Sequence, residues 1–197
     1  MKIKITKSIT DWLGVYKATI PPLHEIKQRN LKLYAKQFNL KLFVETGTYK
    51  GDMIAALKTD FELLYSIELD GKLFLRAQKK FKKVNNIRLI FGDSGGKSKE
   101  VMALIDRPTL FYLDGHYSGG ITAKGEKDTP IMEELFTILG APDIGHVIII
   151  DDAREFADHQ NQAYPSIQEL KSYVKRENEN LDIVVLDDSI RITPAIQ

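Results

Sequence analysis

Three aspartates stand directly after two apolar runs that could form buried strands. Asp114 follows the run at 110–113, and Asp151 and Asp152 follow the run at 147–150. If these runs are neighbours in a parallel sheet, the three carboxylates converge at one sheet edge. Like charges raise one another's pKa unless a cation compensates them, and carboxylate oxygens suit Mg²⁺. The spacing therefore predicts a metal site of Asp114, Asp151 and Asp152, with loop capping as the alternative.

His116 lies two residues after Asp114 and could act as a general base, because the pKa of a free imidazole is about 6.5. It could also bind the metal or donate to a loop carbonyl. Asp114 is the second expected catalytic residue, since a metal held there would lower the pKa of a substrate hydroxyl.

The glycine-containing segment 117–128 follows these residues directly. It could be a lid that closes over substrate, or a plain surface loop. Lys124, Lys127 and Arg154 lie near the aspartates in sequence and hint at an anionic acceptor. Exposed lysines more often serve only solubility.

A turn with two glycines follows the earlier apolar run at 42–44. The segment 45–51 reads Glu-Thr-Gly-Thr-Tyr-Lys-Gly, and its glycines permit a tight turn that a ligand can approach closely. Tyr49 stands where a dinucleotide-binding motif has its middle glycine, so NAD is disfavoured. The sequence also lacks the Gly-Lys-Ser/Thr motif of a phosphate loop.

Two further carboxylates follow the next two apolar runs. Glu68 lies 21 residues beyond Gly47, which is the usual interval for a carboxylate that binds ribose hydroxyls. Asp93, with Ser94 beside it, could accept a hydrogen bond from an adenine amino group. Each residue alone could be a turn or a cap, but three successive strand ends together predict a nucleoside-containing cofactor.

The elements that would position these residues alternate along the chain. Residues 40–92 read as strand, helix, strand, helix, strand, and the runs at 110–113 and 147–150 read as buried strands. This pattern predicts an α/β fold, a Rossmann-like and mostly parallel sheet with helices on both faces. Within it, apolar residues at four-residue spacing predict a helix from 71 to 81.

Local signals add detail to the C-terminal half. Thr129 and Pro130 resemble an N-cap and a first helical residue, and Ser166 and Glu169 have the spacing of a capping box. The two runs within 183–192 predict a hairpin, which would add an antiparallel C-terminal strand.

Residues 1–40 do not join the alternation. Pro21 and Pro22 break the chain, and about 15 helix-compatible residues follow. We therefore expect an N-terminal helical extension over 1–40 and one domain over 41–197.

Composition excludes several classes of protein. The chain has 197 residues, 43% of them hydrophobic and 28% charged, with net charge +1 and no cysteine. Disorder, a disulfide scaffold and a thiolate metal site are excluded, and a nucleic-acid or membrane partner is not expected. No run of 18 apolar residues and no signal peptide is found, so we expect a cytoplasmic protein. The sequence is also compatible with a homo-oligomer.

The stretch from 41 to 192 resembles class I S-adenosylmethionine-dependent methyltransferases. Residues 45–47 with Gly51 look like the first motif of that family, Glu68 like the acid that ends its second strand, and residues 92–94 like its adenine-side motif. The resemblance implies that S-adenosylmethionine is held by Glu45, Thr46, Gly47, Thr48, Gly51, Glu68, Asp93 and Ser94.

Within the class, the Glu-Thr-Gly opening is most similar to macrocin-type sugar O-methyltransferases. Those enzymes and the catechol type carry metal-binding acids that match Asp114, Asp151 and Asp152, although residues 116–120 depart from the macrocin pattern. The resemblance implies Mg²⁺-assisted methyl transfer to a hydroxyl of a small molecule, such as a sugar or an anionic metabolite. The alternatives are a metal-independent enzyme that uses His116 as base and a non-catalytic nucleotide-binding module.

Overall fold

The structure is a computed structural model that describes residues 21–115, 129–156 and 164–195. The strands in these ranges are β1 (Leu42–Thr46), β2 (Leu63–Glu68), β3 (Ile87–Phe91), β4 (Thr109–Leu113), β5 (Val147–Ile150), β6 (Leu181–Leu186) and β7 (Ser189–Pro194). The helices are α2 (His24–Gln37), α3 (Asp52–Leu57), α4 (Gly71–Phe81), α5 (Ser94–Met102), α6 (Ile131–Leu139) and α7 (Ile167–Glu177), with a 3-10 turn at Ala153–Phe156.

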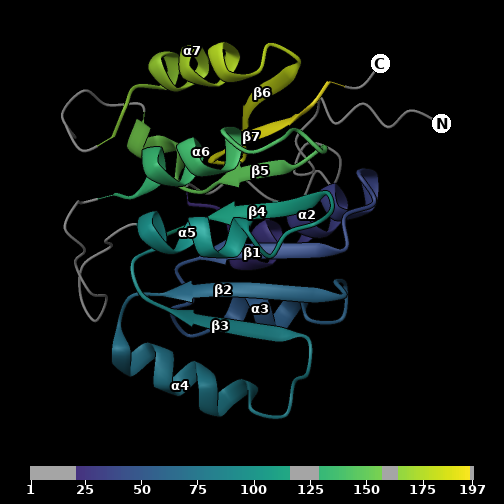
Figure 1. Ribbon diagram of the computed structural model, residues 1–197, viewed down its shortest axis with the longest axis vertical. Helices are drawn as coiled ribbons and strands as arrows, with labels where there is room; N and C mark the ends of the chain where they lie inside the picture. The colour runs from purple at the N-terminus through teal and green to yellow at the C-terminus, as the bar shows by residue number, and fades with distance from the viewer. Residues whose placement is uncertain (1–20, 116–128, 157–163, 196–197) are drawn as a thin grey trace.

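The seven strands form one sheet in the order β3-β2-β1-β4-β5-β7-β6. Strands β1 to β5 pair in parallel, whereas β7 is antiparallel to both β5 and β6. The arrowheads of β2, β3, β4 and β5 all point to the left in Figure 1, so their carboxyl ends meet on that side. The predicted Rossmann-like sheet with an antiparallel C-terminal strand is confirmed.

The hairpin between β6 and β7 turns at Asp187 and Asp188, whose φ angles are 48° and 55°. Two central residues in the left-handed region are typical of a two-residue type I′ turn, in which aspartate is well tolerated. The predicted hairpin is therefore present, with both strands longer than the apolar runs alone suggested.

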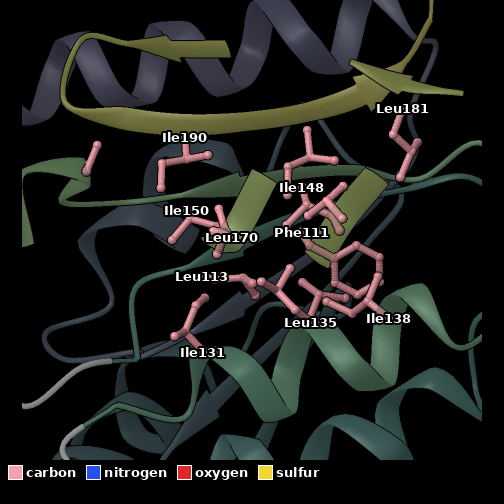
Figure 2. Packing of buried hydrophobic residues seen from close by; sticks show 14 of the residues in the cluster. Phe111, Leu113, Ile131, Leu135, Ile138, Ile148, Ile150, Leu170, Leu181 and Ile190 are labelled. Atoms are coloured by element: carbon pink, nitrogen blue, oxygen red, sulfur yellow. The ribbon is translucent and has the colours of Figure 1, made fainter. Parts of the chain in front are cut away.

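Helices cover both faces of the sheet. Side chains of α2, α3 and α4 pack with Phe43, Leu64 and Leu110 on one face. Side chains of α5, α6 and α7 pack with Phe111 and Ile148 on the other, the cluster drawn in Figure 2. Figure 1 shows α5 and α6 in front of the sheet and α2 and α3 behind it. Burial on both faces explains why the central strands are continuous apolar runs.

Two predicted helix starts can be compared with the structure. Helix α7 has the expected capping box between Ser166 and Glu169. Helix α6 begins at Ile131, so Pro130 occupies the N-cap position and Thr129 lies one residue further out than predicted. The Thr129 hydroxyl still accepts a bond from the Ile131 amide at 3.4 Å. Helix α5 was not predicted, although its N-cap Asp93 was singled out for another role.

The described part of 1–40 is helical and packs on the domain. Helix α2 buries Leu31, Tyr34 and Ala35 in the same cluster as α3. The boundary of the predicted extension at residue 40 stays a prediction. Among the described residues, no helix combines the length and the apolar character that crossing a membrane requires.

Candidate functional site

A cleft of about 330 Å³ lies at the carboxyl ends of the parallel strands. This volume is in the range of small-molecule sites, and the position is where open α/β sheets bind ligands. Its lining includes seven of the predicted site residues: Gly47, Glu68, Asp93, Ser94, Asp114, Asp151 and Asp152.

The turn after β1 forms one wall of the cleft. Gly47 has φ +83°, and a Cβ at this position would lie 2.4 Å from the backbone oxygen of Asp114. The glycine is therefore required by the close approach of the β4 end as well as by its backbone conformation. Tyr49, also in the cleft wall, has φ 50°, an uncommon conformation for a bulky side chain.

Glu68 holds this turn in place from the end of β2. Its carboxylate accepts the Tyr49 amide at 2.7 Å and the Asp70 amide at 2.8 Å. Burial raises the pKa of Glu68, while the two backbone donors act in the opposite direction. The predicted ribose-binding carboxylate thus faces the cleft and also orders the loop across from it.

Four predicted cofactor residues lie behind the cleft wall instead of in its lining: Glu45, Thr46, Thr48 and Gly51. Ser66 donates to Glu45 at 2.6 Å, and the hydroxyls of Thr48 and Ser66 lie 2.5 Å apart. Burial raises the pKa of Glu45 well above its usual value. Gly51 is the N-cap of α3 with φ +68°. These residues support the turn. Their contribution to cofactor binding stays a prediction.

Asp93 and Ser94 start helix α5 at the edge of the cleft. The Asp93 carboxylate accepts the Gly95 amide at 2.9 Å and so caps the helix. Ser94 and Thr46 donate to Glu134 on α6, a fully buried carboxyl whose pKa burial raises to about 7. Within the described residues, Oε1 of Glu134 has no hydrogen-bond partner.

The predicted acidic cluster lies at the other end of the cleft. Asp114, Asp151 and Asp152 all line it, together with Lys27 from helix α2. Lys27 Nζ lies 2.5 Å from Asp151 Oδ2 and 3.5 Å from Asp152 Oδ1. The Tyr112 hydroxyl donates to the same Asp151 Oδ2 at 2.6 Å. A lysine from outside the predicted domain therefore enters the cluster.

Arg154 supplies a second positive charge to this end. Its guanidinium pairs with Asp152 Oδ1 at 2.9 Å and also with Asp188 in the β6–β7 turn. Asp152 itself has φ 55°, and its side chain is nearly buried. Arg154, one of three basic residues that hint at an anionic acceptor, is paired with carboxylates of the chain; the nature of the acceptor stays a prediction.

The three aspartates do not fit Mg²⁺ in this arrangement. Mg²⁺ needs near-ideal octahedral coordination by open oxygens, whereas Asp151 Oδ2 already accepts bonds from Lys27 and Tyr112. Among the described residues, no group of three or more histidine or acidic side chains is arranged to hold a metal ion. This arrangement therefore does not support the predicted Mg²⁺ site of Asp114, Asp151 and Asp152. His116, the segment 117–128, Lys124 and Lys127 lie outside the described residues.

Lys27 is a charged residue of the cleft that sequence reasoning missed. It stands in α2, 124 residues before its partner Asp151, with no local motif around it. The one available signal was the excess of acids at two strand ends, which called for a compensating cation of some kind.

No family model and no curated protein matches the chain. Solved structures do match over nearly the whole chain. A Staphylococcus aureus protein proposed to be a caffeoyl-CoA O-methyltransferase is 13% identical, with TM-score 0.63, over 95% of this chain and 88% of that one. A Bacillus cereus O-methyltransferase in complex with S-adenosylhomocysteine is 14% identical, with TM-score 0.61, over 98% and 94%.

An O-methyltransferase of tomaymycin synthesis from Streptomyces achromogenes, in complex with S-adenosylmethionine, is 13% identical, with TM-score 0.59, over 95% of this chain and 86% of that one. At such identities the likeness establishes the fold that the chain shares with these proteins.

Proposed function

We propose that the chain binds S-adenosylmethionine in the cleft and transfers its methyl group to a hydroxyl of a small molecule. The observation that carries the proposal is the alignment of Gly47, Glu68 and Asp93 at three successive strand ends around one cleft. The shared fold with O-methyltransferases, two of them holding this cofactor or its product, supports the same reading.

The charges of the cleft favour this cofactor over a dinucleotide. Among the described lining residues, five are acidic and two are basic: Glu68, Asp93, Asp114, Asp151 and Asp152 against Lys27 and Arg154. S-adenosylmethionine carries a positive sulfonium and a positive amino group against one carboxylate, and an acidic cleft attracts this net positive charge. The pyrophosphate of NAD is negative and would be repelled.

The residues present fit the groups of the cofactor. Glu68 faces the cleft and can accept hydrogen bonds from ribose hydroxyls, and Gly47 leaves its backbone bare beside them. When bound, S-adenosylmethionine supplies an electrophilic methyl group, which passes to the acceptor oxygen as the bond to sulfur breaks and its electron pair stays on sulfur.

The chain must place the acceptor oxygen in line with that methyl carbon and accept the hydroxyl proton. Asp114 lines the cleft at the end of β4 and is a candidate for that base. His116, two residues further on, stays a prediction for the same role. The sugar or anionic nature of the acceptor, the macrocin-type specificity and the cytoplasmic location also stay predictions.

Calorimetry with S-adenosylhomocysteine and with NAD tests the cofactor. We expect micromolar binding of S-adenosylhomocysteine and none of NAD. Glu68→Ala should weaken binding by about 1.5–3 kcal/mol, or roughly 10- to 150-fold, which is typical of lost hydrogen bonds to a charged group.

Asp70→Asn is the matched control, because Asp70 caps α4 two residues away and does not line the cleft. Asparagine keeps the cap while removing a nearby negative charge, so binding should stay close to wild type. Binding of NAD without S-adenosylhomocysteine would refute the proposal. Turnover is then measured by mass spectrometry on a panel of hydroxylated acceptors.

A further inference from the structure

Lys27 occupies the centre of the acidic cluster. Its ammonium lies within ion-pair distance of both Asp151 and Asp152, and its side chain is only 17% exposed. Helix α2 holds it there through the buried residues Leu31 and Tyr34, which pack beneath β4 and β5. The lysine is thus fixed by the packing of its helix.

The charge state of Lys27 follows from its neighbours. A lysine ammonium is ordinarily protonated at neutral pH, since its usual pKa is about 10.4, and this one lies between the carboxylates of Asp151 and Asp152. Lys27 is therefore a cation here and does not act as a base. It supplies the positive charge that three converging carboxylates require.

Basic side chains in the cluster already bind carboxylate oxygens that a metal would need as ligands. A divalent cation would need oxygens of Asp151 and Asp152, yet one oxygen of each already pairs with a basic side chain. The Tyr112 hydroxyl donates to the same oxygen of Asp151 as Lys27, at 2.6 Å.

We propose that Lys27 is the built-in cation at the end of the cleft lined by Asp114, Asp151 and Asp152, here called the acceptor end, in the place that a divalent metal would otherwise take, so that the protein works without a metal. This inference rests on the proposed methyl transfer. It makes Lys27 a positioning residue, which fixes Asp151 and Asp152 beside Asp114. It also makes helix α2 part of the site.

Thermal melts with Mg²⁺ or EDTA test the inference on the whole chain. Wild type should melt at the same temperature with EDTA and with millimolar Mg²⁺. Lys27→Ala should melt lower in EDTA, because it leaves the carboxylates uncompensated, and should gain an upward shift with Mg²⁺ on the order of 2–4 °C. Lys27→Arg keeps the charge and should stay insensitive to Mg²⁺.

Lys32→Ala is the matched control on the same helix, since Lys32 pairs with Asp60 and does not line the cleft. It should respond to Mg²⁺ as wild type does. If Lys27→Ala does not fold, Lys27→Gln, which keeps most of the aliphatic stem, carries the same test. A Mg²⁺ shift in wild type, or none in a folded variant that lacks the Lys27 charge, would overturn the inference.

Binding of S-adenosylhomocysteine separates this result from the proposed function. If the cofactor product binds but wild type responds to Mg²⁺, the inference fails and the proposed function stands. If it does not bind, the proposed function fails, while the metal response of Lys27→Ala still reports which cation the cluster holds. Where turnover is found, its survival in EDTA supports the inference, and its loss refutes it.

Discussion

The two ends of the cleft hold their carboxylates by different means. At the cofactor end, Glu68 and Asp93 accept hydrogen bonds from backbone amides, at most 19 residues away in the chain. At the acceptor end, Asp151 and Asp152 are held by the side chains of Lys27, Tyr112 and Arg154. Backbone turns hold the carboxylates at one end, and mainly ion pairs hold them at the other.

This difference determines how each end responds to change. Backbone donors come with the fold and survive most substitutions, so the cofactor end depends on turn geometry. Side-chain donors vanish with a single substitution and leave a buried charge without compensation, which is costly. Substitution of a turn glycine should therefore disrupt the cofactor end, and substitution of a charged residue should disrupt the acceptor end.

The largest effect is expected at Gly47, where the two ends touch. Gly47→Val forces a β-branched residue into the left-handed region and against the Asp114 carbonyl. We expect the free energy of unfolding to fall by about 2–5 kcal/mol and S-adenosylhomocysteine binding to fall below detection. Chemical denaturation and calorimetry measure the two effects.

Gly96→Ala is the control for this variant. A Cβ at Gly96, inside helix α5, would meet no atom within 4 Å. Alanine in a helix is favoured over glycine by roughly 0.5–1 kcal/mol, so this variant should be slightly stabilised and should bind normally. Normal binding by Gly47→Val would mean that the turn has no part in the site.

Within the described part of the chain, the carboxyl of Glu134 is held neither by backbone amides nor by a cation, since its partners are two hydroxyls. Burial raises the pKa of Glu134 from an ordinary 4.5 to about 7, so the folded state keeps a proton that the unfolded state releases. Its contribution to stability is complete below pH 4.5, declines as pH rises and is lost above about pH 7. The whole change corresponds to about 3 kcal/mol.

Melting curves from pH 4 to pH 8 check this expectation, with Glu134→Gln as the comparison. Glutamine cannot ionise, so the variant should gain stability relative to wild type as pH rises, by about 3 kcal/mol in total. Glu45 and Glu68 have pKa values raised in the same direction, and the difference between the two proteins removes their effect. A difference that is constant over this range would contradict the prediction.

The smallest effect separates two roles of Asp93. Asp93→Ser keeps an oxygen that can cap α5, so stability should change by no more than about 0.5 kcal/mol. If Asp93 binds the adenine as predicted, the shorter serine side chain loses that hydrogen bond, so affinity for S-adenosylhomocysteine should fall about tenfold. Unchanged affinity would mean that Asp93 caps α5 and does not bind the cofactor.

The sequence predicts elements whose signals are local. Helix α4 spans the expected residues because Asp70 caps it and its apolar residues recur every four positions. Strand β5 is an uninterrupted apolar run and also keeps its expected bounds. Helix α5 escaped prediction because Gly95 and Gly96 weaken the helix signal and because its buried face holds serine and glycine in place of an apolar stripe.

The same distinction holds within the site. The residues at the strand ends could be located because each directly follows an apolar run, and the structure puts seven of them in one cleft. The direction in which each side chain points could not be read so simply, and Glu45 and Thr48 turn out to lie behind the wall. Lys27 could not be found at all, because its role depends on a contact across 124 residues.

That long separation has a consequence for how the chain is made. Helix α2 leaves the ribosome well before β5, and the ion pair between Lys27 and Asp151 must wait for 124 further residues to be synthesised. Closing so long a loop is among the costlier steps in entropy, and contacts of this kind form late. We expect helix α2 to pack on α3 early, because both belong to one buried cluster, whereas the ion pair that completes the acceptor end forms only after β5 has been made.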